Sequence, residues 1–190
     1  MFEVVIDNKT YLHPSKIEEV NLDQWIALNS EKEDELKAFS AFSGIPYKQL
    51  LASPKKDVQE HLNRLSILLK KSAELVENDP PDSIKIGAST YYVEKDMDGA
   101  SMAQYLDCTH YMRLFTGNQS EFYPYMMAIY CLRKGEKYNN DKYDIQKRAK
   151  VMRKAQAVDA IKINAFFLHG SKDYEVNFTA YFQANQHKNS

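Results

Sequence analysis

Residues 4–28 read VVIDNKTYLHPSKIEEVNLDQWIAL, and residues 84–108 read IKIGASTYYVEKDMDGASMAQYLDC. Aligned without a gap at an offset of 80 residues, the two stretches share four identities, and further positions keep an apolar or aromatic side chain. In each stretch a short alternating run, a polar turn and a second short run that carries Thr-Tyr predict a β-hairpin. We therefore expect two hairpins, each followed by a helix, and interpret them as an internal duplication. The alternative is a chance agreement of common hairpin–helix signals.

The helix after each hairpin starts with the same pair of residues. Asn21 precedes Gln24 by three positions, and Ser101 precedes Gln104 by three positions. At this spacing the Gln side chain can accept a hydrogen bond from the backbone N–H of the capping residue, as in a capping box. We interpret both Gln residues as helix caps rather than as ligand-binding amides.

Outside the hairpins, the apolar side chains follow the helical period. Helices are predicted over 36–42, 123–132, roughly 141–155 and 158–168. The aromatic residues over 174–182 fit a helix and also an alternating strand, and we favour the helix.

A longer helix is predicted to begin at Pro54 and to end before the run Asn-Asp-Pro-Pro-Asp at 78–82, which is the best linker candidate. The fold class predicted from these patterns is α+β, mainly helical, with two short β-hairpins each followed by helices. We place a first repeat at 1–79 and a second repeat at 80–190, and we expect the two to pack as one compact unit.

Composition narrows the class of protein. Hydrophobic residues make up 44% and charged residues 27%, as in ordinary globular domains. The net charge of -1 gives no overall attraction to nucleic acid or to anionic membranes. No apolar run approaches the roughly 18 residues that span a bilayer, and the start lacks the regions of a signal peptide. Two cysteines, Cys108 and Cys131, favour a reducing compartment over a disulfide framework.

Catalytic motifs are absent from the sequence. It contains no Gly-Lys-Ser/Thr phosphate loop, no Gly-x-Gly-x-x-Gly motif and no Gly-x-Ser-x-Gly elbow. The five histidines are scattered, without metal-ligand spacing. Cys108 and His110 form the one conceivable catalytic pair, although residues two apart point to different faces of a helix. We predict no enzyme activity, no cofactor and no metal site.

The near-neutral net charge conceals two charged regions. Residues 1–40 hold 4 basic and 9 acidic side chains, whereas residues 130–162 hold 10 basic and 4 acidic ones. Three interpretations stay open. The charges form solvated helix faces, or acidic and basic ends of neighbouring copies meet, or the basic segment 133–154 binds phosphate groups of a nucleic acid.

Tyrosine is abundant, with 13 Tyr beside 9 Phe and 1 Trp in 190 residues. Tyrosine combines a large apolar area with a polar tip and is enriched at protein interfaces, so we predict an extensive partner surface. The alternative is an aromatic-rich core. The predicted contact residues are seven aromatic anchors, four cations and four acids: Trp25, Tyr91, Tyr92, Tyr123, Tyr125, Tyr138, Tyr143, Lys147, Arg148, Arg153, Lys154, Glu31, Glu33, Asp34 and Glu35.

Residues 4–11 and 19–28 resemble the start of small morphogenesis proteins of tailed bacteriophages, and residues 124–130, 135–138 and 165–168 are similar to their second half. The group includes neck or tail ring proteins and tail-assembly chaperone-like proteins, notably among the crAss-like phages of Bacteroides-type hosts. The resemblance implies a non-enzymatic virion protein, assembled in the host cytoplasm, that forms a homo-oligomeric ring and binds other virion proteins.

Three hypotheses follow from the sequence. The first is a ring or connector component of a phage neck or tail, with a transient tail-assembly chaperone as its variant. The second is a nucleic-acid-binding adaptor that uses the basic segment 133–154. The third is an enzyme with an unfamiliar site around Cys108 and His110, which requires those side chains to converge in one cleft.

Overall fold

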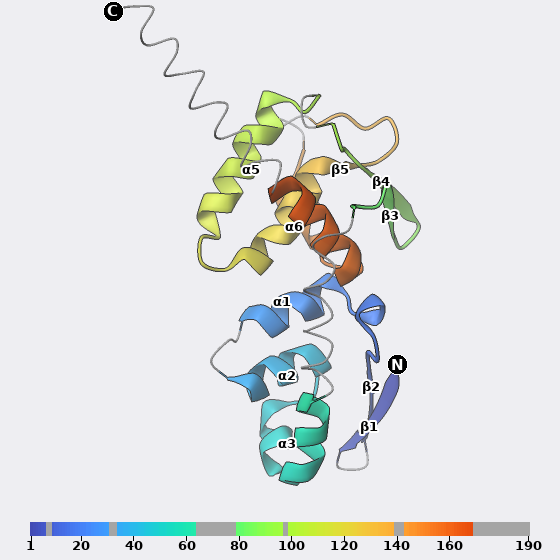
Figure 1. Ribbon diagram of the computed structural model, residues 1–190, viewed down its shortest axis with the longest axis vertical. Coiled ribbons are helices and arrows are strands. Elements are labelled where there is room, and N and C mark those ends of the chain that lie inside the picture. Colours follow the sequence, from blue (N-terminus) through green and yellow to red (C-terminus); the bar gives the residue numbers. More distant parts are fainter. Residues whose placement is uncertain (7–8, 31–33, 64–78, 97–98, 139–142, 169–190) are drawn as a thin grey trace, which may run out of the picture.

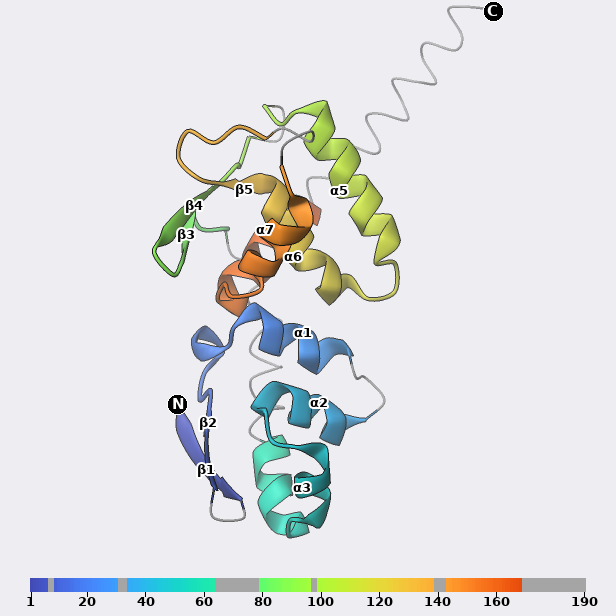
Figure 2. The same cartoon turned by 180° about the vertical axis from the view of Figure 1, so that it is seen from behind.

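The structure is a computed structural model of the chain. It describes residues 1–6, 9–30, 34–63, 79–96, 99–138 and 143–168. Figure 1 shows two lobes stacked along the long axis of the molecule. Both small sheets lie along one side, and most helices lie along the other side (Figures 1 and 2).

The first lobe is built around a two-stranded antiparallel sheet. Its elements are β1 (Phe2–Ile6), β2 (Lys9–His13), a short 3-10 helix (Ile17–Glu19), α1 (Leu22–Ser30), α2 (Glu35–Ser43), α3 (Tyr47–Ala52) and a helix over 55–63. Val4 pairs with Tyr11 in the sheet register. The helix α2 ends at Gly44, whose φ of 72° is the left-handed conformation that favours glycine after a helix.

The second lobe combines a three-stranded antiparallel sheet with four helices. Its elements are β3 (Ser83–Ile86), β4 (Ser89–Val93), α5 (Met102–Leu114), α6 (Gln119–Tyr130), β5 (Cys131–Leu132), α7 (Ile145–Met152) and a helix over 157–168. The strand order is β3-β4-β5. The fold is therefore α+β and mainly helical, and both predicted hairpins are present.

The two helix caps are also confirmed. The backbone N–H of Asn21 donates to Oε1 of Gln24 (3.1 Å), and the backbone N–H of Gln24 donates to Oδ1 of Asn21 (2.9 Å). Ser101 and Gln104 make the same reciprocal pair at 2.9 and 3.3 Å. In both places the Gln amide nitrogen also donates to a carbonyl of a later helix, at 3.4 Å for Gln24 and 3.0 Å for Gln104. The two pairs, 80 residues apart, thus cap the starts of their helices in the same way.

Each lobe has its own cluster of buried apolar side chains, and we call these the first and the second cluster after the lobes. Each cluster also includes residues of the other lobe. Leu22 and Ile26 of α1 belong to the second cluster, and Ala157 belongs to the first. Trp25 packs against both clusters. Residues from both sides of the expected boundary at 79 and 80 thus share each cluster, and that boundary stays a prediction.

Main-chain hydrogen bonds connect the lobes at a place that we call the junction, formed by Val20, Leu22, Ala155 and Ala157. The N–H of Leu22 donates to the carbonyl oxygen of Ala155 (2.9 Å). The N–H of Ala157 donates to the carbonyl oxygen of Val20 (2.8 Å). The chain after α7 therefore returns to the start of α1 and holds it in place.

Two helix predictions need correction at their ends. The apolar helix predicted over 123–132 ends at Tyr130, because Cys131 takes an extended backbone conformation and pairs with Val93 as part of β5. The charged helix predicted over 141–155 is shorter, because the side chain of Asp144 accepts a hydrogen bond from the N–H of Lys147 and caps α7 there. The tail prediction over 174–182 lies outside the described residues.

Candidate interaction surfaces

Tyr91, one of the predicted aromatic anchors, lies in the core. Its side chain is 1% exposed, because the alternation of β4 turns Tyr91 inward and Tyr92 outward. The guanidinium carbons of Arg133 and Arg148 lie 5.5 and 5.0 Å from the centre of its ring. The prediction of a partner contact is therefore wrong for Tyr91, which forms a cation–π cluster inside the chain.

Tyr138 and Tyr143 are also used within the molecule. The hydroxyl of Tyr138 donates to Oδ2 of Asp107 (2.6 Å), and the hydroxyl of Tyr143 donates to the carbonyl oxygen of Ala128 (2.5 Å). Burial raises the pKa of both hydroxyls, and the carboxylate of Asp107 adds to the shift for Tyr138. Their polar tips are thus not available as contact groups, and the prediction is corrected for both.

The remaining aromatic anchors differ in exposure. Tyr123 and Tyr125 are half-buried and pack against the second cluster. The ring of Tyr125 stacks on Tyr111 with a centroid distance of 4.5 Å. Trp25 is half-buried, whereas Tyr92 is exposed. The alternative of an aromatic-rich core thus holds for most of the set, and Tyr92 remains the best surface anchor.

Two arginines of the basic region 130–162 form ion pairs with carboxylates of the same chain. Arg153 pairs with Asp23 at 2.8 Å, across 130 residues of sequence, and also with Glu121. Arg148 pairs with both carboxylate oxygens of Glu136, at 2.5 and 3.2 Å. Both arginines were predicted to face acids of a neighbouring copy, so this part of the prediction is corrected. Hydrogen bonds between arginine and a carboxylate are stronger than hydrogen bonds between neutral groups.

The lysines of α7 remain on the surface. Lys147 and Lys150 of α7 are exposed, and so is Lys154 in the turn that follows the helix. We call this set the α7 lysine face. None of the three makes an ion pair with another described residue.

Two of the predicted acidic contacts, Asp34 and Glu35, lie at the start of α2. Asp34 caps this helix, since its Oδ1 accepts from the N–H of Leu36 (3.1 Å) and of Lys37 (3.0 Å). These bonds hold the pKa of the Asp34 carboxyl below its usual range, the N–H of Lys37 contributing most. Glu35 is exposed, and positions 31 and 33, both Glu, lie outside the described residues. The structural role of Asp34 therefore accounts for one of the four acids.

The hypothesis of an enzyme site at Cys108 and His110 is not supported by the geometry. Cys108 is buried and His110 is exposed, so their side chains point to opposite sides of α5. Burial raises the pKa of the Cys108 thiol to about 12, which leaves no thiolate to act as a nucleophile. Among the described residues, no group of three or more His, Cys, Asp or Glu is arranged to hold a metal ion.

Within the described ranges, no helix combines the length and the apolar character needed to cross a bilayer.

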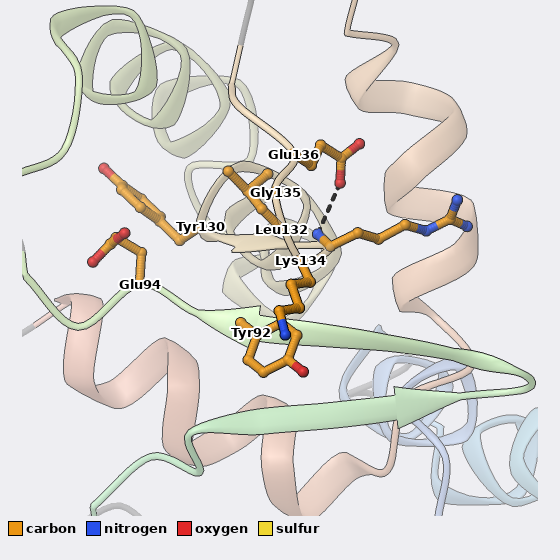
Figure 3. Close-up of a pocket in the computed structure, with 8 residues that line it drawn as sticks. Tyr92, Glu94, Tyr130, Leu132, Lys134, Gly135 and Glu136 are labelled. Atoms are coloured by element: carbon orange, nitrogen blue, oxygen red, sulfur yellow. Dashed lines mark hydrogen bonds between the residues drawn. The ribbon is translucent and has the colours of Figure 1, made fainter.

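An open pocket of about 410 Å³ lies beside β5, at the end of the second sheet (Figure 3). Tyr92, Glu94, Tyr130 and Lys134 line it, and the backbone N–H of Glu94 donates to the carbonyl oxygen of Tyr130 (3.0 Å). Leu132 contributes an apolar wall. None of the residues that line the pocket is Ser, Cys or His. The exposed Tyr92 in its lining makes this pocket the first candidate interaction surface.

A second surface is the outer face of the β1–β2 sheet, which sequence reasoning missed. Val5 is 64% exposed and Leu12 is 60% exposed, although Val4 and Ile6 beside them are buried. We call Val5 and Leu12 the hairpin surface. The signal was present in the sequence, because an apolar residue between two inward-facing apolar residues of a strand must point outward.

A third surface is the outer side of α5. Met102, Leu106 and Leu114 are all exposed there, and we call them the α5 stripe. Their spacing of four and eight residues places them on one side of a helix.

No family model, no curated protein and no solved structure matches the chain, so its function has to be inferred from these surfaces and from the sequence.

Proposed function

We propose that the protein is a non-enzymatic assembly subunit that acts by binding copies of itself and other proteins. In the setting that the sequence resemblance implies, it is a ring or connector component of the neck or tail of a bacteriophage. The observation that carries the proposal is the hairpin surface, where Val5 and Leu12 are both more than half exposed. Contiguous exposed apolar side chains on a folded protein favour protein–protein contact.

The pairing of β1 with β2 makes this surface suitable for a neighbour. Val5 lies opposite Thr10 and Leu12 lies opposite Glu3, so the two apolar side chains are diagonal neighbours on the outer face. No third described strand pairs with β1 or β2. The outer edges of this sheet therefore have backbone groups that an added strand can pair with.

The second sheet offers a complementary surface in the other lobe. β5 is a two-residue edge strand, and the exposed Tyr92 lies on β4 beside it. Both sheets lie along the same side of the molecule (Figures 1 and 2). A contact between the first sheet of one copy and the second sheet of the next is heterologous, and repeated contacts of this kind produce a ring or a filament.

The first test is the mass of the protein in solution, measured by light scattering over a concentration series. We expect the natural chain to form oligomers and the double variant Val5→Lys/Leu12→Lys to shift toward the monomer. Leu51→Lys is the matched control, because Leu51 is equally exposed (60%) but lies on α3. A monomeric natural chain, or equal behaviour of the double variant and the control, would contradict self-association through the hairpin surface.

A mixing experiment tests whether the contact is heterologous. The variant Tyr92→Lys should also lose oligomers, because it changes the complementary surface on the second sheet. Mixed with Val5→Lys/Leu12→Lys, it should form a dimer and nothing larger, since each variant retains one intact surface. If the mixture stays monomeric, the two surfaces do not bind each other.

The ring component and the transient chaperone differ in their fate. A ring or connector component stays in the finished particle, whereas a chaperone leaves. Mass spectrometry of purified virions distinguishes them, and we expect the protein to be found there.

A second candidate, the nucleic-acid-binding adaptor, is favoured by one observation, the α7 lysine face. Three exposed lysines, two on α7 and one in the turn after it, form a cationic surface of the kind that contacts phosphates. Arg148 and Arg153 of the same segment are occupied by Glu136, Asp23 and Glu121, which weakens this candidate. A gel-shift series with duplex DNA at increasing salt tests it, and the adaptor requires retardation that falls steeply with salt.

A further inference from the structure

Both sheets have an outer strand with one open edge. Among the described strands, β1 is paired with β2 alone, and β3 is paired with β4 alone. Backbone N–H and C=O groups on such an edge can pair with a strand of another chain. The position of these groups therefore decides which strands can join.

Main-chain hydrogen bonds show which residues of β3 direct their N–H and C=O groups away from β4. The N–H of Val93 donates to the carbonyl oxygen of Asp82 (2.9 Å), in the register of the β3–β4 pair. In an antiparallel pair, hydrogen-bonded residues alternate with residues that are not hydrogen-bonded to the partner strand. Ser83 and Lys85 therefore direct their backbone groups outward.

The outward residues of β1 follow from the same rule. β1 pairs with β2 in the register that β3 and β4 repeat 80 residues later, and two residues separate the strands in both hairpins. The alternation therefore makes Glu3 and Val5 the outward residues of β1. Each of the two edges thus presents two outward residues.

The other edges of the sheets are less suited to an added strand. β2 is followed by Pro14, which has no N–H, and α2 packs against β2. β5 has two residues, of which Cys131 is buried. The N–H of Arg133, directly after β5, already donates to Oε2 of Glu136 (2.8 Å).

One antiparallel register between β1 and β3 pairs all four outward residues. It places Glu3 opposite Lys85 and Val5 opposite Ser83, whereas a shift by two residues leaves one of them unpaired in each strand. Glu3 and Lys85 are exposed, and neither forms an ion pair with another described residue. Opposite charges that face each other stabilise an antiparallel pair, and neither β1 with β1 nor β3 with β3 offers such a pair.

The same register brings the hairpin surface and Tyr92 onto one face of a joined sheet. Val5 lies beside Ser83 of the next copy, and Tyr92 lies opposite Ser83 on the following strand. Tyr92 and Val5 are then two strands, or roughly 10 Å, apart, with the small side chain of Ser83 between them.

We propose that the edge of β1 pairs with the edge of β3 of the next copy, antiparallel and with Glu3 opposite Lys85. The two-stranded sheet of one copy and the three-stranded sheet of the next then form one continuous sheet. This inference rests on the proposed function, because it specifies the strands and the register of the contact between copies. Each copy uses β1 toward one neighbour and β3 toward the other, so the contact can repeat.

Exchange of the charged pair tests the register. Glu3→Lys and Lys85→Glu should each weaken oligomer formation at least roughly tenfold in light scattering, because each places like charges opposite each other. The double variant Glu3→Lys/Lys85→Glu should restore the oligomers. Lys48→Glu is the control, because Lys48 is an exposed lysine on α3, and it should change nothing. A double variant as weak as the single ones overturns the proposal.

Disulfide formation between two chains is a second measurement. Opposite Cα atoms of a hydrogen-bonded antiparallel pair are roughly 5.5 Å apart, within the range of a disulfide. A mixture of Glu3→Cys and Lys85→Cys chains should therefore give a disulfide-linked dimer. A mixture of Leu12→Cys and Lys85→Cys chains is the control and should not, because Leu12 is one strand farther away. The native Cys108 and Cys131 are buried, and burial raises the pKa of both thiols, so they do not compete.

The outcomes separate this inference from the proposed function. A natural chain that is monomeric at all concentrations contradicts both. Oligomers of the natural chain without the disulfide between positions 3 and 85, or with equal cross-linking of the control mixture, leave self-association in place and overturn the pairing of β1 with β3.

Discussion

Among single residues, His13 makes the stability of the first lobe depend on pH. Its side chain is fully buried, with ring centroids 5.6 Å from Phe39 and 6.3 Å from His61. Burial, followed by the charge of His61, lowers the pKa of His13 from 6.5 to about 4. The unfolded chain therefore binds a proton at a higher pH than the folded chain does.

We expect the stability of the protein to fall as the pH is lowered from 6.5 toward 4. The contribution of His13 is fully present above its unfolded pKa, and its loss between pH 7 and pH 5 is on the order of 2 kcal/mol. Urea unfolding at the two pH values measures this difference. The variant His13→Phe, which cannot titrate, should show a smaller difference, and an unchanged one would assign the effect to other groups.

Arg153 is the second residue with a specific energetic role. It binds Asp23 of α1 and Glu121 of α6, so one guanidinium joins three parts of the chain. Arg153→Ala removes the bonds to two charged partners and should lower the free energy of unfolding. The loss should be only about 1–2 kcal/mol, because these bonds are partly exposed to solvent. The neighbouring Lys154→Ala, an exposed lysine of the α7 lysine face, should change it by less than about 0.5 kcal/mol. Chemical denaturation of both variants compares the two, and equal losses would show that Arg153 acts only as surface charge.

At the scale of elements, the two Gln caps should differ in energy although they do the same work. Gln104 is buried, and its amide donates to Ile129 at 3.0 Å, whereas the corresponding bond of Gln24 to Phe42 is 3.4 Å long and partly buried. We expect Gln104→Ala to cost about 2 kcal/mol and Gln24→Ala about 1 kcal/mol, since a buried unpaired carbonyl adds to the loss of the cap. Thermal unfolding of the two variants tests this order. A larger loss for Gln24→Ala would contradict it.

The sequence was most informative at this scale. The hairpins, both caps and the end of α2 at Gly44 depend on residues that are close in the chain, and they could be predicted. The strand β5 could not, because Cys131 and Leu132 continue an apolar run and become a strand only by pairing with β4. Long-range contacts override local preference there.

The contact residues were harder to predict than the elements. Nothing in the sequence near Arg153 indicates Asp23, which is 130 residues away. The number of tyrosines likewise does not indicate which hydroxyls donate hydrogen bonds within the chain, as those of Tyr138 and Tyr143 do. The hairpin surface, in contrast, followed from strand alternation and could have been found.

At the scale of the whole molecule, we expect the two lobes to unfold together. Each cluster contains residues from the other lobe, and the single Trp of the chain, Trp25, packs against both clusters. Trp fluorescence and far-ultraviolet circular dichroism should therefore give coincident urea transitions, as for a two-state domain. Ile26→Ala truncates a side chain of α1 in the second cluster. The free energy of unfolding obtained from both signals should therefore fall equally, by about 2–4 kcal/mol. Separate transitions would show that the lobes are independent domains.

The junction has a consequence for how such a protein can change over time. Its hydrogen bonds run from Leu22 to Ala155 and from Ala157 to Val20, and all four groups are main-chain atoms. Any amino acid except proline supplies the same N–H, and every amino acid supplies the same carbonyl. Mutations can accumulate at these positions, within the limits of packing, without removing the bonds that orient one half of the protein on the other. Descendants could thus keep the architecture long after their sequences have stopped looking alike.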